Sequence, residues 1–156
     1  MHTLMLILHV TAAILLIGPV TVAVSTFHSF AKKAAVGDDH AKGIARLLQS
    51  ISQKYGMFSV LVPLLGFGVW FTDWNTYKSD YFMHTAILLS IIAWAILFFL
   101  IIPTQKKAIH SLGLADAGDE PVDLAGFHLE KAVKMLPMFG GIFSALWVVC
   151  AVLMFF

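Results

Sequence analysis

Charged residues are scarce in this chain of 156 amino acids, because only 12% are Asp, Glu, Lys or Arg and 60% are hydrophobic. Soluble domains carry about 25% charged residues, so the composition predicts an integral membrane protein. Cys150 is the only cysteine, which excludes an internal disulfide, a Cys-x-x-Cys redox motif and a thiolate zinc site. With a net charge of +1 and no basic patch interleaved with aromatic residues, the chain also lacks the pattern of a nucleic-acid-binding surface.

The N-terminal stretch MHTLMLILHV has no Lys or Arg before its apolar run. A cleavable signal peptide needs such a basic region, so we interpret this stretch as the start of a retained first transmembrane helix. About 20 apolar residues suffice for a helix to cross the hydrocarbon core of a bilayer. Four stretches meet this length, at residues 3–27, 55–74, 82–103 and 135–156. The sequence therefore predicts a single membrane domain over 1–156 with an all-α fold, a four-helix transmembrane bundle.

The basic residues divide unevenly among the segments that connect these spans. Nine of the ten Lys and Arg lie in segments 28–54 and 104–134, and only Lys78 lies between the second and third spans. Basic residues accumulate in cytoplasmic loops, so we expect both segments in the cytoplasm and both termini on the outer side of a bacterial inner membrane. Within 28–54, an Asp38 or Asp39 cap followed by apolar residues at helical spacing predicts a short amphipathic helix. This helix would lie at the membrane surface or, as the alternative, would dock a cytoplasmic partner.

Small residues recur on two of the predicted spans. They are Gly140, Gly141, Ser144 and Ala145 on the fourth span and Thr11, Gly18 and Ser25, seven residues apart, on the first. Lipid supplies no hydrophobic drive between helices, so close packing of helices in a membrane needs small side chains. We expect these faces to contact a neighbouring helix of the chain, or a helix of another membrane subunit or of a second copy.

Two histidines lie inside predicted spans, His9 in the first and His84 near the start of the third. An ionisable residue within a membrane span is a candidate functional residue, and the predicted topology puts both imidazoles in the outer leaflet. Two facing imidazoles on neighbouring helices can ligate haem iron axially. Met5 and Met83 lie close to them in sequence, and thioether together with imidazole suits copper. The alternative is structural: His9 donates to a backbone carbonyl, and His84 is wetted at the interface.

No Asp, Glu, Lys or Arg lies in the middle of a predicted span. Proton relays and ion-coupled carriers usually depend on such charges, and no nucleophile–base set or phosphate loop is present inside the bundle, so we expect no enzyme. The pattern favours a non-catalytic subunit or accessory protein of a larger membrane complex. The alternative is a membrane protein that binds haem b or, on a weaker hypothesis, copper through His9 and His84, acting in electron transfer or metal handling.

Three stretches together carry a resemblance to known proteins. They are LILHVTAAILLIG with its histidine, the basic first loop, and the third span that closes in IIPTQKKAI. This pattern resembles a family of uncharacterised bacterial integral membrane proteins with four helices, over nearly the whole chain. The resemblance implies the four-span fold and an inner-membrane location, and it implies no activity. The layout is also similar to that of copper-resistance membrane domains and of b-type cytochrome anchors.

Overall fold

The computed structural model of the protein describes residues 2–72 and 74–154, and it contains no strand over these residues. The helices are α1 (His2–Ala35), α2 (Asp39–Phe58), α3 (Leu61–Thr72), α4 (Trp74–Tyr77), α5 (Tyr81–Ala95), η1 (Ile96–Ile101), α6 (Ile102–Ser111) and α7 (Leu129–Leu153). The element η1 is a π-helix that joins α5 directly to α6. The predicted all-α class is therefore confirmed. The last two residues of the predicted fourth span lie outside the described residues.

Four helical segments are long and apolar enough to cross a membrane: Thr3–Ala35, Asp39–Thr72, Tyr81–Ser111 and Leu129–Leu153. They agree with the predicted multi-pass membrane protein. All four are longer than the predicted spans, because the helices continue into the polar segments that the sequence assigns to loops. The 34 residues of α1 extend about 51 Å at 1.5 Å per residue, whereas the hydrocarbon core of a bilayer is about 30 Å thick. The bundle is therefore long enough to project out of the membrane.

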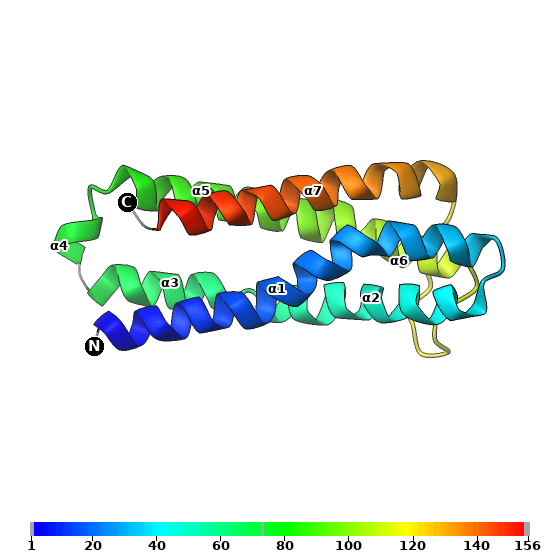
Figure 1. The fold of residues 1–156 in the computed structure, drawn as a ribbon, viewed down its shortest axis with the longest axis horizontal. Coiled ribbons are helices and arrows are strands. Elements are labelled where there is room, and N and C mark those ends of the chain that lie inside the picture. Colours follow the sequence, from blue (N-terminus) through cyan, green and yellow to red (C-terminus); the bar gives the residue numbers. More distant parts are fainter. Residues whose placement is uncertain (1, 73, 155–156) are drawn as a thin grey trace.

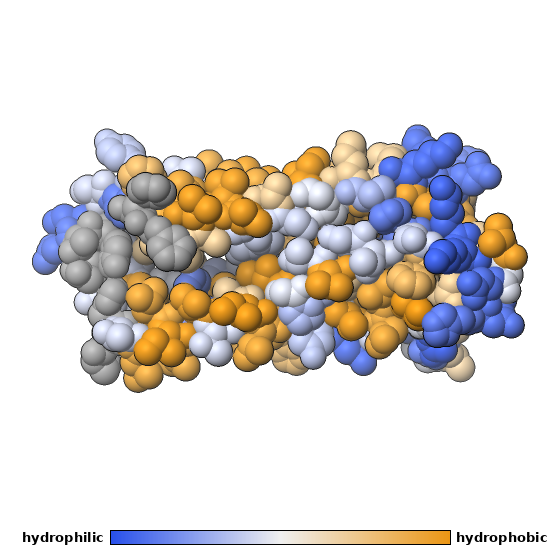
Figure 2. Space-filling view, viewed as in Figure 1, coloured by the Kyte–Doolittle hydropathy of each residue, from blue (hydrophilic) through white to orange (hydrophobic). Residues whose placement is uncertain are grey.

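The helices form four rods, and each rod runs antiparallel to the one that follows it along the chain (Figure 1). The first rod is α1, the second is α2 followed by α3, the third is α5, η1 and α6, and the fourth is α7. The α1–α2 turn and the long α6–α7 connection lie at one end, which we name the loop end. Both chain termini and α4 lie at the opposite end, which we name the terminal end. Figure 2 shows hydrophilic residues gathered at the loop end, next to a surface with many hydrophobic residues.

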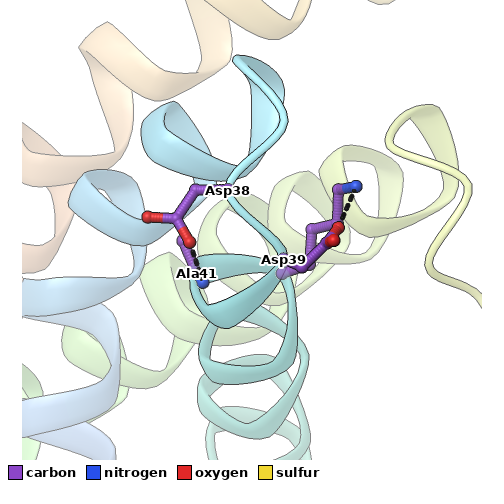
Figure 3. Close-up of polar contacts among 4 residues, drawn as sticks. Asp38, Asp39 and Ala41 are labelled. Atoms are coloured by element: carbon purple, nitrogen blue, oxygen red, sulfur yellow. Dashed lines mark hydrogen bonds and ion pairs between the residues drawn. The ribbon is translucent and has the colours of Figure 1, made fainter.

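The helix predicted between the first two spans has a different place from the one expected. It begins at a predicted cap, because the Asp38 carboxylate accepts a hydrogen bond from the Ala41 amide at 3.0 Å, beside an ion pair of 2.6 Å between Lys42 and Asp39 (Figure 3). However, α2 has 20 residues and packs along α1 as part of the bundle, so a short helix at the membrane surface is not confirmed. Small buried side chains, Ala41 and Ala45, permit this close packing.

The hydrophobic core lies mainly in the loop-end half of the bundle and draws on all four rods. Its buried members include Phe27 on α1, Leu48 on α2, Leu97 on η1 and Phe143 on α7. Next to this core, α1 and α7 come into backbone contact. A Cβ atom placed on Gly140 would lie only 2.9 Å from the carbonyl oxygen of Val24, so this crossing requires a glycine.

The remaining small residues of the predicted packing faces divide into two groups. Ser144 is half-buried and donates to the carbonyl of Gly140 at 2.8 Å, so it belongs to the packed part of α7. By contrast, Gly141, Ala145 and Gly18 are exposed, and a Cβ on either glycine would meet nothing within 4 Å. The chain itself thus covers Gly140 and leaves Gly18 and Gly141 uncovered.

The two adjacent glycines of α7 give a matched test of this packing. We expect Gly140→Ala to destabilise the bundle by about 1–3 kcal/mol, as overpacking of a core does, because the added methyl group meets the Val24 backbone. Gly141→Ala adds the same methyl group in open space, so its melting temperature should equal or slightly exceed that of the parent protein. Thermal unfolding in mild detergent measures both variants. Equal melting temperatures for the two would contradict the proposed crossing.

Candidate functional site

His9 occupies an unusual position on α1. Between residues 3 and 16 it is the one buried side chain, with 6% of its surface exposed. Its neighbours Leu8 and Val10 are exposed, as expected for side chains that face lipid. This part of α1 therefore buries its histidine and leaves its large apolar side chains exposed or only partly covered. The reason lies in α3, which packs against this part of α1.

The His9 imidazole makes a hydrogen bond across the helix interface. Its Nδ1 atom lies 2.8 Å from the carbonyl oxygen of Val62, in the first turn of α3. A carbonyl oxygen only accepts hydrogen bonds, so Nδ1 carries the proton and, in a neutral imidazole, Nε2 keeps a free lone pair. The contact lies where the second rod is irregular. Pro63 offers no amide to the Ser59 carbonyl, which instead accepts from the Val62 amide at 3.0 Å.

Two glycines of α3 make room for the side chains of α1. A Cβ on Gly66 would lie 3.0 Å from Cε1 and 3.3 Å from Nδ1 of His9, so the imidazole rests directly on the α3 backbone. A Cβ on Gly68 would lie 3.5 Å from the sulfur of Met5. Since Met5 and His9 are one helical turn apart, the same face of α1 presents both potential metal ligands to α3.

His84 lies at the start of α5 and has a different environment. The Asp80 side chain caps this helix by accepting from the amides of Phe82 and Met83. The Nδ1 atom of His84 lies 2.6 Å from the Asp80 carbonyl oxygen, so it also carries the proton, and the side chain is exposed. The imidazole stands edge-on to Trp70 of α3, with 5.9 Å between the ring centres.

The structure brings both histidines to α3 without joining them. His9 contacts Gly66 and His84 contacts Trp70, and these two α3 residues are one helical turn apart. Among the described residues, no hydrogen bond or ring contact links the two imidazoles. In the same part of the chain, no three His, Cys, Asp or Glu side chains gather as metal ligands. Each imidazole thus donates Nδ1–H to a backbone carbonyl and keeps the lone pair of its Nε2 atom.

Sequence reasoning does not identify the residues that hold the histidines in place. Val62 contributes only a backbone carbonyl, which no sequence pattern reveals. The two glycines that flank Phe67, two residues apart in an apolar helix, are the signal that could have indicated a close contact at this point. Trp70 reads as an aromatic residue of the membrane interface, and its contact with His84 depends on how the rods are arranged.

Comparison with protein-family models, with curated proteins and with solved structures finds no match to this chain. The four long apolar helices agree with the resemblance to four-helix membrane proteins. Membership of that family and a bacterial origin stay proposals.

The glycine beneath His9 can be tested against its neighbour. We expect Gly66→Ala to displace the imidazole from Val62 and to destabilise the protein by about 1–3 kcal/mol, because the methyl group enters the space of the ring. Gly68→Ala brings the same group only into ordinary contact with the flexible end of Met5, so it should have a much smaller effect. Thermal unfolding gives the stability, and ¹⁵N NMR of the histidine nitrogens reports the hydrogen bond. An unchanged His9 spectrum in Gly66→Ala would contradict this geometry.

Proposed function

We propose that the protein is a non-catalytic subunit or accessory protein of a larger membrane complex. The observation that carries this proposal is the uncovered stripe on α1. Thr11, Gly18 and Ser25 are all exposed, and a Cβ on Gly18 would meet nothing within 4 Å. Small residues let helix backbones approach closely in lipid, so this stripe suits a transmembrane helix of a partner subunit. A helix of a second copy of the chain is the alternative occupant.

The orientation that we propose follows from the basic residues. Segments 28–54 and 104–134, which hold nine of the ten Lys and Arg, belong to the loop-end half of the bundle. Basic residues favour the cytoplasmic side, which supports a cytoplasmic loop end and termini on the outer side of a bacterial inner membrane. The short α1–α2 turn and the α6–α7 connection add little mass outside the helices, which favours a subunit that acts with others.

Photocrosslinking in native membranes tests the partner. We expect a photoreactive amino acid at Gly18 to form an adduct with a second membrane protein, whereas the same group at Leu88, an exposed position on α5, should react with lipid. Gly18→Leu should remove the partner on purification in mild detergent without lowering the melting temperature, because the side chain points into open space. A solitary monomer with no protein adduct from Gly18 would contradict the proposal.

A second candidate function is favoured by the shared hydrogen bonding of His9 and His84. Histidines that ligate a metal usually donate their other ring nitrogen to a carbonyl or carboxylate, and both imidazoles donate Nδ1–H to a backbone carbonyl. They could therefore ligate haem b through Nε2 and act in electron transfer. Copper is the weaker form of this candidate, in which the sulfurs of Met5 and Met83 would join the imidazoles.

Absorption spectroscopy tests this candidate directly. If the protein binds haem b, the purified chain should show a Soret band and sharpened bands after dithionite reduction, and both His9→Ala and His84→Ala should lose them. His40→Ala changes an exposed histidine near the start of α2 and should keep the full spectrum. A featureless spectrum after expression with added haem, together with no copper by elemental analysis, would reject both forms.

A further inference from the structure

A glutamine lies in the hydrophobic core of the loop-end half. Gln105 on α6 has no exposed surface, and neither its amide oxygen nor its amide nitrogen finds a hydrogen-bond partner within the described residues. It shares a helix face with Ala108 on α6 and with Ile101 at the end of η1, and both of these are also fully buried.

Ser52 of α2 lies at the same level of the bundle as Gln105. The two rods touch where a Cβ on Gly56 would lie 3.3 Å from the side chain of Ile102. The helices α2 and α6 run antiparallel. One helical turn closer to the loop end, the residue on α2 is therefore Ser52 and the residue on α6 is Gln105. Ser52 is fully buried, and its hydroxyl donates to the Leu48 carbonyl at 3.0 Å, which leaves the lone pairs of its oxygen to accept.

A solvent-lined region begins one further turn toward the loop end. Gln49 on α2 and Ile109 on α6 line an open cleft, which Asp119 of the α6–α7 connection also lines. His110 also lines this cleft, and its Nε2 atom is buried without a partner among the described residues. Buried polar atoms without a partner therefore lie both at the cleft, in His110, and in the core, in Gln105.

These observations define the ligand that the core requires. An amide offers two donors and an acceptor oxygen, and burying it unpaired is strongly unfavourable. No charged side chain is among the buried residues here, so the ligand is a small neutral molecule that both donates and accepts. Buried waters of this kind typically make about three hydrogen bonds to otherwise unpaired groups. We propose that Gln105 and Ser52 hold a buried water site between α2 and α6, one turn inside the loop-end cleft.

Nuclear magnetic resonance of the full chain in nanodiscs tests this site. The chain has three glutamines, Gln49, Gln53 and Gln105, so ¹⁵N-glutamine labelling gives a simple spectrum in which Gln105→Leu identifies the third signal. We expect the Gln105 side-chain amide to show a cross-relaxation peak to water with the sign of a long-lived bound molecule. The side chains of Gln49 and Gln53 are hydrogen-bonded to each other beside the cleft at 2.8 Å. Their cross-relaxation peaks to water should have the sign typical of surface water that exchanges fast.

A pair of serine variants keeps the test independent of whether Gln105→Leu folds. Ser52→Ala should weaken the water peak of Gln105, because it removes an acceptor, whereas Ser50→Ala changes a cleft-lining serine and should leave the peak unchanged. Cross-relaxation of the Gln105 amide with protein methyl groups alone would overturn the proposal. A peak to a resonance that belongs neither to water nor to the protein would also overturn it, in favour of a bound organic molecule.

Discussion

The backbone contact between α1 and α7 at Val24 and Gly140 determines how the rest of the bundle is arranged. On its loop-end side, all four rods contribute to the apolar core around Phe27 and Phe143. On its terminal-end side, α1 lies beside α3 and α5 lies beside α7. His9 belongs to the first of these helix pairs and His84 to the second.

Two irregular pieces of backbone lie at similar levels of neighbouring rods. The second rod is interrupted between α2 and α3 at Ser59 and Val60, and the third rod contains the π-helix η1. The Trp94 indole donates to the Ser59 hydroxyl at 3.0 Å, while this hydroxyl donates to the Gly56 carbonyl at 2.6 Å. Irregular backbone at membrane depth is tolerated where protein covers it. Trp94 of the third rod thus covers the interruption of the second rod.

The sequence predicts the four apolar segments and the Asp38 cap because these features depend on composition and on nearest neighbours along the chain. It does not predict that α2 packs along α1, since an amphipathic pattern is equally suited to a membrane surface or to a helix interface. That His9 donates to a backbone carbonyl was one of the two alternatives from the sequence, and the structure agrees with it. That this carbonyl belongs to Val62 was beyond prediction, because the angular position of α3 is fixed only by the packed bundle. Gln105 reads in the sequence as part of a polar helix end, and only the packing of α2 against α6 makes it a core residue.

The contact between Val24 and Gly140 also has a consequence for biogenesis. Among the described helices, the ribosome makes α1 first and α7 last, yet the core needs both. Until α7 enters the membrane, the α1 surface that Gly140 will cover faces lipid or the insertion machinery. The intermediate α1–α2–α3 unit is held by the packing of α2 on α1 and by the bond from His9 to Val62. Assembly of this four-rod bundle is therefore completed by α7, which joins α1 and closes the ring of rods.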